Sequence, residues 1–395
     1  MTTAPKRHFF SSLDSLRGIA AIMVVFHHMG WVYFGHNNSA VMHGYLAVDF
    51  FFVLSGFVIY HSYGRKIFDL RSLGRFVWLR IGRLLPLHIL FLLVFVGIEF
   101  VRYFASKHLG MTPNFALFET NNLTTFISNA FLTHSLGLHD SLSYNVPSWS
   151  ISVEFATYLI FAAALILLAG RARFIIVAIA VVVSNFSAIS LLGKTNFDFN
   201  YDYGLLRCTG GFFLGTLTYA LYDALTKSRQ ANPMMVTKPA DIDNYFAPAI
   251  LICVVVFFYY KPFHQYDMLF VPLSAGIILA LVLTPNTWLS NFLEHKIFTT
   301  LGKWSYSIYL SHFAIMWVLN QGIRMVLKVP TLQDPLTGKP VIQTDPVTGL
   351  AFAGLAIMIV LIVSRFTYEW VEKPFRNMAK NMLVSRSKST EIVTS

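Results

Sequence analysis

The sequence predicts an all-α fold, a polytopic membrane helix bundle with about ten transmembrane helices. Of the 395 residues, 55% are hydrophobic and only 12% are charged, whereas soluble domains carry about 25% charged residues. The apolar residues gather into runs of about 17 to 25, the length that crosses ~30 Å of hydrocarbon. These runs are continuous rather than alternating, which favours helices over the strands of a membrane barrel. Composition excludes a soluble enzyme, a disordered protein and a secreted disulfide scaffold.

The order of the apolar runs sets the topology. With ten crossings, both termini lie on the same side of the membrane. The segments on that side hold twenty Lys and Arg residues, whereas the opposite loops hold four. Because cytoplasmic loops are enriched in Lys and Arg, both termini are predicted to be cytoplasmic. This asymmetry explains the net charge of +11, so nucleic acid is not an expected partner. The predicted spans are 15–35, 43–63, 84–104, 149–169, 174–193, 205–224, 245–260, 268–284, 304–327 and 350–370.

The chain is expected to form one membrane domain with short polar ends. Arg17 interrupts the first apolar run and no small-residue cleavage site is present, so a removed signal peptide is not expected. On the outer side, the pattern over 126–132 predicts a short helix, and the proline- and glycine-rich loop 330–349 predicts irregular turns. The predicted regions are a cytoplasmic segment at 1–12, the membrane domain at 13–376 and a disordered basic cytoplasmic tail at 377–395.

Arg17 and His28 lie on one face of the first predicted helix. They are eleven positions apart, and at 100° per residue this is within about 20° of three full turns. The helical rise separates them by ~16 Å, with Arg17 near the cytoplasmic surface and His28 inside the membrane. Ionisable side chains within spans face the bundle interior and are functional candidates. Alternatively, Arg17 snorkels to lipid head groups and His28 makes an interhelical hydrogen bond.

Arg80 and Arg83 are neighbours on the helix that enters the third span. Residues three apart share a helix face, and the guanidinium fork matches the oxygens of a phosphate group. The alternative is that both side chains anchor the helix to lipid head groups. Spacing alone does not distinguish a phosphate ligand from a lipid.

Three more ionisable residues lie in predicted spans. Asp49 is a lone carboxylate among aromatic residues, which either pairs with a buried cation or stays protonated, and we expect the pairing. Glu154 follows Trp149 and two serines at the outer end of the fourth span, which suits a polar cavity open to the outside. His312 adds to a polar stripe on the ninth span. No His-x-x-x-His pattern and no Cys/His cluster occur, so no metal is expected.

Seven short motifs follow one another along the chain. In this order they resemble acyltransferase family 3, a family of integral membrane acyltransferases, from residue 13 to residue 376. The motifs are Leu13-Asp14-Ser15-Leu16-Arg17-Gly18-Ile19-Ala20-Ala21, Arg17 with His28 after ten intervening residues, Val48-Asp49-Phe50-Phe51-Phe52-Val53-Leu54-Ser55-Gly56-Phe57, Arg80-x-x-Arg83, Trp149-Ser150-x-Ser152-x-Glu154, Ser305-Tyr306-Ser307-Ile308-Tyr309-Leu310-x-His312 and Glu372-Lys373-Pro374-Phe375-Arg376.

The resemblance implies an O-acetyltransferase of the bacterial inner (cytoplasmic) membrane. It implies that acetyl-CoA in the cytoplasm is the acyl donor and that the acceptor is a hydroxyl of a glycan at the outer face. O-antigen, exopolysaccharide or a related cell-surface polysaccharide is the expected acceptor. The family's arginine and histidine motif falls on Arg17 and His28, and its paired-arginine motif falls on Arg80 and Arg83.

The expected mechanism combines these residues. Arg80, Arg83 and Arg17 hold the phosphates of acetyl-CoA while the thioester reaches His28. His28, aided by Arg17 and Glu154, acts as a general base on the acceptor hydroxyl or accepts the acyl group itself. The remaining assignments are Trp149, Ser152 and Tyr144 for acceptor binding, and Asp14, Asp49 and His312 for structural support.

Two other functions fit a membrane bundle with buried charges. One is acyl transfer to a small-molecule hydroxyl, as on an antibiotic. The other is a permease or flippase without acyl-transfer activity. The cytoplasmic basic cluster and the face shared by Arg17 and His28 argue against transport. A transporter moves its substrate unmodified, whereas an acyltransferase consumes acetyl-CoA.

Overall fold

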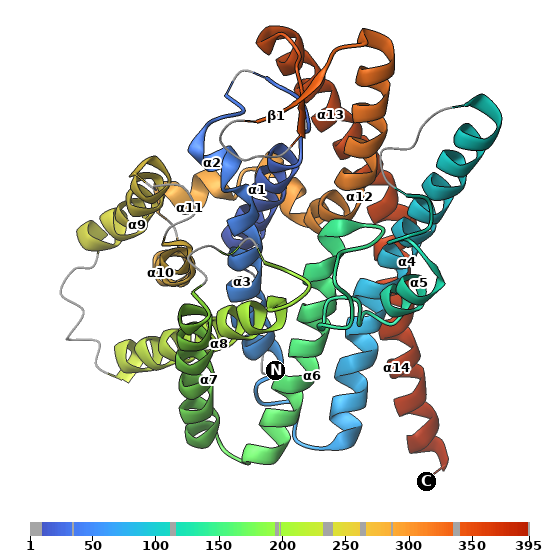
Figure 1. Cartoon of the computed structure of the whole chain (residues 1–395). Helices are drawn as coiled ribbons and strands as arrows, with labels where there is room; N and C mark the ends of the chain where they lie inside the picture. The colour runs from blue at the N-terminus through green and yellow to red at the C-terminus, as the bar shows by residue number, and fades with distance from the viewer. Residues whose placement is uncertain are drawn as a thin grey trace.

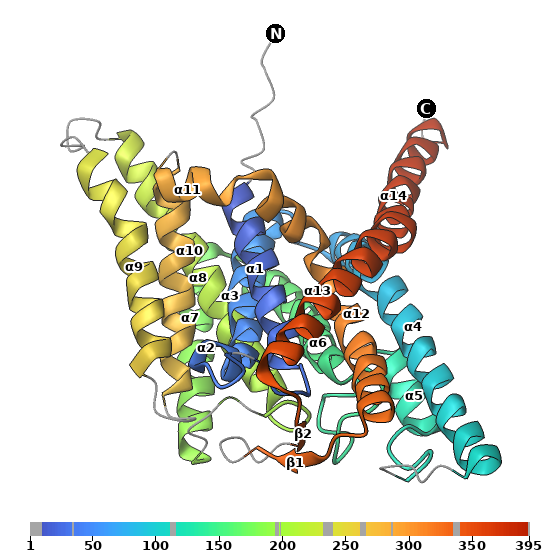
Figure 2. The same ribbon diagram turned by 90° about the horizontal axis from the view of Figure 1, so that it is seen from above.

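The chain folds into a bundle of long helices (Figures 1 and 2). The computed structural model describes residues 10–33, 35–110, 116–193, 197, 199–231, 240–260, 266–285, 287–334 and 340–393. The helices are α1 (Ser11–His27), α2 (Ser39–Met42), α3 (Ala47–Tyr63), α4 (Leu70–Leu109), α5 (Leu123–Ala130), α6 (Trp149–Leu168), α7 (Arg171–Leu191), α8 (Gly204–Ala231), α9 (Ala240–Tyr260), α10 (Phe270–Leu283), α11 (Trp288–Leu293), α12 (Lys296–Leu327), α13 (Pro346–Thr367) and α14 (Lys373–Val393). Short 3-10 turns cover Gly44–Leu46, Val146–Ser148 and Asp267–Leu269, and a π-helical turn covers Tyr368–Glu372.

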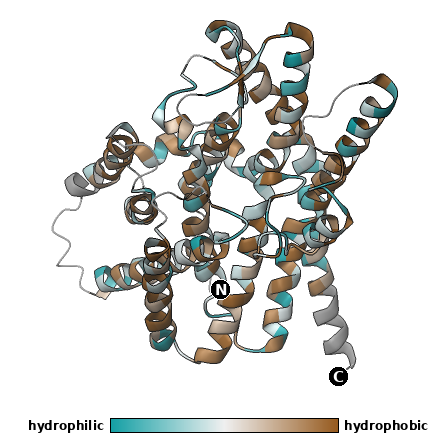
Figure 3. Cartoon of the chain, viewed as in Figure 1, coloured by the Kyte–Doolittle hydropathy of each residue, from teal (hydrophilic) through white to brown (hydrophobic). Residues whose placement is uncertain are grey.

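Each of the ten predicted spans overlaps a helix, and the chain is an all-α membrane protein. The first predicted span, 15–35, is wrong at its end, because α1 ends at His27. Apolar residues make up most of the length of the helices, whereas hydrophilic residues gather in loops and at helix ends (Figure 3). The number of ten crossings and the cytoplasmic placement of both termini stay predictions. Among the described residues, five helical segments are long and apolar enough to cross a membrane: Gly44–Tyr63, Leu70–Leu109, Val146–Leu168, Arg171–Leu191 and Pro346–Val384.

Glycines allow the central helices to touch. α1 packs along α12, and α3 packs along α8. A methyl group at Gly18 would lie 2.5 Å from the backbone nitrogen of Gly302, and one at Gly302 would overlap the backbone of Asp14. Gly56 and Gly215 permit the same close approach between α3 and α8. The contact at Gly302 brings Arg17 of α1 against α12.

α4 and α12 both contribute residues to the two cavities described below. α4 begins at a capping box in which Asp69 accepts a hydrogen bond from the Ser72 backbone N–H (2.7 Å) and from its hydroxyl (2.6 Å). These hydrogen bonds hold the pKa of Asp69 below its ordinary value. The C-terminal ends of α4 and α12 lie apart in both views (Figures 1 and 2).

Three segments differ from the sequence predictions. The loop 330–349 contains an antiparallel hairpin of β1 (Thr331–Gln333) and β2 (Pro340–Ile342). The short outer helix, predicted over 126–132, is α5 at Leu123–Ala130.

The third difference is at the C-terminal end. The tail predicted to be disordered continues as α14 as far as Val393. Gly82 of α4 leaves space for the side chain of Ala379, and the Trp78 indole donates a hydrogen bond to the Ala379 carbonyl (3.1 Å). Packing on α4 thus stabilises a polar segment that the composition alone would leave unfolded.

Candidate active site

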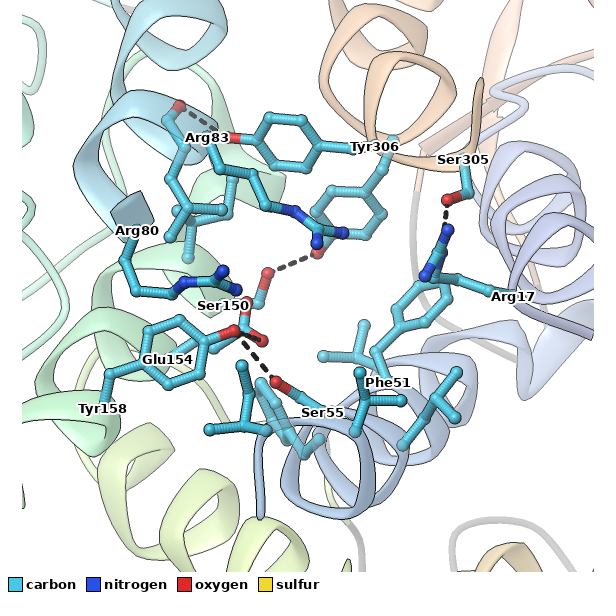
Figure 4. Close-up of a pocket in the computed structure, with 18 residues that line it drawn as sticks. Arg17, Phe51, Ser55, Arg80, Arg83, Ser150, Glu154, Tyr158, Ser305 and Tyr306 are labelled. Atoms are coloured by element: carbon cyan, nitrogen blue, oxygen red, sulfur yellow. Dashed lines mark hydrogen bonds between the residues drawn. The ribbon is translucent and has the colours of Figure 1, made fainter. Parts of the chain in front are cut away.

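Five helices, α1, α3, α4, α6 and α12, surround a polar cavity that we call the first cavity. Its volume is about 120 Å³, and its charged lining residues are Arg17, Arg80, Arg83 and Glu154. This space accommodates several water molecules, and hence a charged group of a ligand. Figure 4 shows the arginine side chains entering it from α1 and α4. The other polar side chains that line it are Ser55, Ser150, Tyr158, Ser305, Tyr306 and Tyr309.

Arg17 is held at one side of the first cavity. Its guanidinium group lies 2.8 Å from the Asp14 carboxylate and donates hydrogen bonds to the Ser305 hydroxyl (2.8 Å) and the Gly302 carbonyl (2.9 Å). Asp14 therefore compensates the charge of Arg17.

Arg80 is enclosed by aromatic rings. Its guanidinium carbon lies 5.4 Å from the ring centre of Tyr63, 5.7 Å from that of Phe76 and 6.0 Å from that of Tyr158. It donates one long hydrogen bond to the Tyr63 hydroxyl (3.4 Å), and its Nε has no hydrogen-bond partner among the described residues. The ring faces attract the cation but leave N–H groups available to an anionic ligand.

Arg83 points into the first cavity from the next turn of α4 (Figure 4). Within the described residues it makes no hydrogen bond and no ion pair, and Glu154 and Glu372 attract it only over longer distances. A cation without a partner inside a protein is unfavourable unless a ligand supplies the negative charge. With Arg17 balanced by Asp14, the lining retains two arginines and one carboxylate, which suits an anion.

Glu154 belongs to a hydrogen-bonded chain on the facing wall. The Tyr158 hydroxyl donates to the Glu154 carboxylate (2.6 Å), and the Ser55 hydroxyl lies 2.9 Å from the Tyr158 oxygen. The sequence suggested an outer position from which Glu154 aids His28. The structure instead places Glu154 in the first cavity with Arg80 and Arg83, whereas His28 is outside the lining of this cavity.

His28 lies just beyond α1, against His312 of α12. Its Nδ1 is 2.9 Å from the Val24 carbonyl oxygen. Because a carbonyl only accepts, Nδ1 carries the proton and Nε2 carries the lone pair. By the same argument, Nδ1 of His312 donates to the Tyr309 carbonyl (2.6 Å), and its Nε2 faces Nδ1 of His28 at 3.4 Å. These contacts orient the His28 ring and make Nε2 its basic nitrogen.

A second cavity, of about 1110 Å³, lies further along α4 and α12. α4 lines the first cavity within 80–84 and the second within 95–109. α12 lines them within 305–309 and 313–328 respectively. Residues between 120 and 146 contribute to the wall of the second cavity. Because both helices pass one cavity and then the other, the cavities lie toward opposite ends of the bundle.

His28 lines neither cavity but lies between residues of the two, a position that we call the junction. Its ring centre is 5.6 Å from that of Phe313, which lines the second cavity, and 5.0 Å from that of His312. The ring of Tyr309, which lines the first cavity, lies 5.9 Å from that of His312. Arg17 of α1 and His28, the residue that follows α1, both contact α12.

The residues expected to bind the acceptor lie in different surroundings. Tyr144 lines the second cavity, and its hydroxyl donates to the Asn122 carbonyl (3.0 Å). Trp149 packs over the Arg207 guanidinium (5.1 Å) and lines neither cavity. Ser152 is fully buried and donates to the Leu132 carbonyl (2.8 Å). Of the three residues, only Tyr144 lines one of the two cavities, and acceptor binding stays a prediction for all three.

Asp49 pairs with a buried cation, as expected. The Arg207 guanidinium donates to both Asp49 carboxylate oxygens, at 2.8 and 2.7 Å. Both side chains are almost fully buried, with 2% and 1% exposed. Arg207 also donates to the backbone carbonyls of Phe197 and Tyr45. The pair joins α3, α8 and the segment before α8.

Asp49→Ala is expected to destabilise the folded chain by about 3–5 kcal/mol, because it leaves the buried Arg207 charge without a partner. In the double variant Asp49→Leu/Arg207→Met, most of this loss is recovered, since two apolar side chains of similar size need no counter-charge. Thermal unfolding of the protein in detergent measures both variants. Equal losses in the single and double variants would contradict the ion-pair role.

Two groups of lining residues were not predicted from the sequence. Tyr158 follows Glu154 by four positions, so helical spacing alone places it on the same face. Trp317, Gln321, Arg324 and Lys328 line the second cavity at spacings of four, three and four. In both cases the sequence pattern that marks these residues is a polar helix face inside an apolar run. In the part of the chain that the structure describes, no three His, Cys, Asp or Glu side chains gather to hold a metal ion.

The site falls within a match to one protein family. A model of the acyltransferase domain of acyltransferase family 3 matches residues 10–369, which include both cavities and the junction. The chain belongs to this family of acyltransferases. The resemblance drawn from the seven motifs is confirmed.

Curated relatives of the acyltransferase come from several bacteria. It is 27% identical, over 96% of its length, to YrhL of Bacillus subtilis, whose name provisionally assigns it peptidoglycan O-acetyltransferase activity. It is 24% identical, over 95%, to the peptidoglycan O-acetyltransferase OatA of Listeria monocytogenes. Over 41% of the chain it is 30% identical to "Protein 2 in picA locus" of Rhizobium radiobacter, covering 85% of that protein. The chain spans 58% of YrhL and 57% of OatA, under two thirds of each. No solved structure matches the chain.

Proposed function

We propose that this acyltransferase moves an acetyl group from cytoplasmic acetyl-CoA to a hydroxyl of a cell-surface glycan, in the bacterial inner membrane. The observation that carries the proposal is the position of His28 between two cavities that lie toward opposite ends of the bundle. The first cavity lies toward the predicted cytoplasmic face and presents arginines. The second lies toward the opposite face. Donor and acceptor can thus reach the same imidazole from the two sides of the membrane.

The arginines of the first cavity suit the donor. Arg83 and Arg80 offer N–H groups to the phosphates of acetyl-CoA, and guanidinium–phosphate hydrogen bonds are strong because both partners are charged. Arg17, already held by Asp14 and Ser305, forms a fixed wall. Its distance of ~16 Å from His28 along the helix is comparable to the extended pantetheine arm. The thioester therefore extends toward the junction while the phosphates stay with the arginines.

The chemistry requires one base at the junction. Nε2 of His28 takes the proton of the acceptor hydroxyl as the hydroxyl oxygen attacks the thioester carbon. The C–O bond forms, the C–S bond breaks, and the proton passes from His28 to the departing thiolate. The products are the O-acetylated glycan and free coenzyme A. Transfer of the acyl group first to Nε2 of His28 and then to the hydroxyl uses the same nitrogen.

His312 positions His28 in this scheme. When His28 becomes an imidazolium, its Nδ1–H is stabilised by the Val24 carbonyl and by Nε2 of His312. His312→Ala is therefore expected to lower kcat about 10- to 100-fold, as loss of such supporting hydrogen bonds does, with an unchanged KM for acetyl-CoA. His312→Gln, which retains an acceptor, recovers part of kcat. Initial rates over a range of acetyl-CoA concentrations test this, and a change confined to KM would contradict it.

A glycan fits the second cavity better than a small-molecule acceptor. A volume of about 1110 Å³ exceeds the upper end of typical small-molecule sites, about 1,000 Å³. Two relatives carry peptidoglycan O-acetylation in their names, and we extend to this chain the class of a cell-envelope glycan.

The proposal is tested with radiolabelled acetyl-CoA and the purified protein in vesicles. Peptidoglycan fragments and a cell-surface glycan extract serve as acceptors, and release of the coenzyme A thiol is measured in parallel. We expect label in the glycan together with an equal amount of thiol. If acetyl-CoA neither binds nor is consumed, the proposal fails, and transport of an unmodified glycan becomes the function to test.

A further inference from the structure

A row of side chains on α12 lines the second cavity from the junction outward. Phe313 contacts His28, and Trp317, Gln321, Arg324 and Lys328 follow toward the outer end. Spacings of three and four residues place Phe313, Trp317, Gln321 and Arg324 on one face of α12. Lys328 follows the last residue of the helix and lines the same cavity. The row therefore begins with an aromatic ring at the reacting centre and ends with two cations.

The two cations at the end of this row are available to a ligand. Within the described residues, neither the Arg324 nor the Lys328 side chain makes a hydrogen bond or an ion pair. Arg102, on the facing wall, is by contrast compensated by Glu99 at 2.6 Å. Glu99 is further satisfied by N–H groups of Phe118 (2.9 Å) and Asn121 (3.2 Å). The uncompensated charge of the second cavity is therefore positive and lies on α12.

We propose that the second cavity binds the acceptor as an extended, negatively charged oligosaccharide. Arg324 and Lys328 hold its anionic group, Trp317 packs against a sugar ring, and Gln321 hydrogen-bonds to hydroxyls. This assignment rests on the proposed function, because it names the acceptor of that same site. It adds a charge requirement to acceptor choice and assigns it to residues outside the family motifs quoted above.

The length of the row determines what kind of acceptor fits. Arg324 is eleven residues beyond Phe313, or ~16 Å along the helix, and Lys328 is ~22 Å beyond it. A single sugar cannot place one hydroxyl at His28 and an anionic group at this distance. The acylated hydroxyl and the bound charge therefore belong to different units of a chain.

The anionic group has two chemical sources. It is either an acidic group of the glycan itself, a carboxylate or phosphate, or the phosphate of a lipid carrier to which the glycan is linked. The walls of the cavity include exposed apolar side chains, Val101 (63%), Leu109 (66%) and Met325 (58%), so a lipid-linked glycan also has access. Both sources supply the same ligand chemistry, oxygen anions for a guanidinium and an ammonium group.

The experiment compares Arg324→Gln/Lys328→Gln with the wild type on three acceptors. These are a neutral oligosaccharide, the same oligosaccharide with one uronic acid, and the neutral oligosaccharide linked to a polyprenyl phosphate in vesicles. We expect the acceptor KM of the double variant to rise about 10- to 100-fold for at least one charged acceptor, with the neutral acceptor unchanged. A higher KM for the oligosaccharide with the uronic acid identifies the glycan's own acidic group as the bound anion. A higher KM for the lipid-linked form identifies the carrier phosphate as the bound anion.

Controls separate this inference from the proposed function. Lys107→Gln removes a cation at the same end of α4 that hydrogen-bonds to Tyr103 and does not line the cavity, so it should leave all three KM values unchanged. Trp317→Ala should weaken the binding of neutral and charged acceptors to the same extent. Acetyl-CoA affinity should stay at the wild-type value in every variant. An unchanged KM for both charged acceptors, or an equal rise for neutral and charged acceptors, would overturn the inference.

Binding of the uronic-acid oligosaccharide to the detergent-solubilised protein, measured by calorimetry, gives a readout that needs no turnover. One outcome is that the wild type consumes no acetyl-CoA, but the Arg324→Gln/Lys328→Gln variant binds this oligosaccharide more weakly than the wild type does. The proposed function then fails while the anionic site stands. If the protein consumes acetyl-CoA but the double variant binds and acetylates as the wild type does, the anionic site fails while the proposed function stands.

Discussion

His28→Ala is expected to lower acetyl transfer by about 10²- to 10⁴-fold, the contribution typical of a general base. The imidazole is the basic group at the junction of the two cavities, and its Nε2 carries the lone pair because Nδ1 donates to the Val24 carbonyl. The arginines of the first cavity remain, so acetyl-CoA should bind with wild-type affinity. Transfer of radiolabel to glycan measures the loss, and binding of labelled acetyl-CoA measures the retained affinity.

His27→Ala is the matched control for this prediction. His27 is the adjacent residue and its Nδ1 lies 3.1 Å from the Val41 carbonyl oxygen, on a different side of the helix from His312. We expect it to retain most of the transfer activity. Wild-type activity in His28→Ala, with normal expression, would remove His28 from the mechanism. Loss of acetyl-CoA binding in His28→Ala would instead indicate that His28 helps to hold the donor.

Arg83→Met is expected to change activity and stability in opposite directions. It removes a cation that has no hydrogen bond or ion pair within the described residues, so the ligand-free protein should unfold at a higher temperature. It also removes a partner for a phosphate group, and the KM for acetyl-CoA should rise about 10- to 100-fold. Thermal unfolding without ligand and initial-rate kinetics measure the two effects. Added acetyl-CoA should raise the unfolding temperature of the wild type more than that of the variant.

Arg75→Gln provides the control for Arg83→Met. Arg75 is an exposed arginine on the same helix and lies outside the first cavity. The unfolding temperature of Arg75→Gln and its KM for acetyl-CoA should match those of the wild type. A lower unfolding temperature for Arg83→Met would show that protein groups already satisfy the guanidinium. An unchanged KM would show that the donor phosphates bind elsewhere.

The sequence by itself determined the class of fold, because hydrophobic length and periodicity are local properties. Each predicted span overlaps a helix, since about twenty apolar residues can satisfy their backbone groups in a membrane only by hydrogen bonding within the segment. The same local geometry predicted that Arg17 and His28 lie toward one side, and both contact α12 although α1 ends at His27. The motifs identified the family because their order along the chain is also a property of sequence.

Only the tertiary structure decided which residues meet. Arg207 is 158 positions from Asp49, and nothing in either neighbourhood marks the two as partners. α6 is apolar around most of its circumference, so its sequence does not specify which face turns toward a cavity. Packing placed Glu154 and Tyr158 in the first cavity, and turned Trp149 and Ser152 toward α8 and the outer loop.

The second cavity depends even more on tertiary structure. Trp317, Gln321, Arg324 and Lys328 form a row in the sequence, but the row becomes a wall only because α4 and α12 separate toward their C-terminal ends (Figures 1 and 2). The sequence thus determined helices and faces, which follow from hydrogen bonds and spacing within a segment. The structure decided cavities and ion pairs, because these depend on the distance between segments that the chain brings together only on folding.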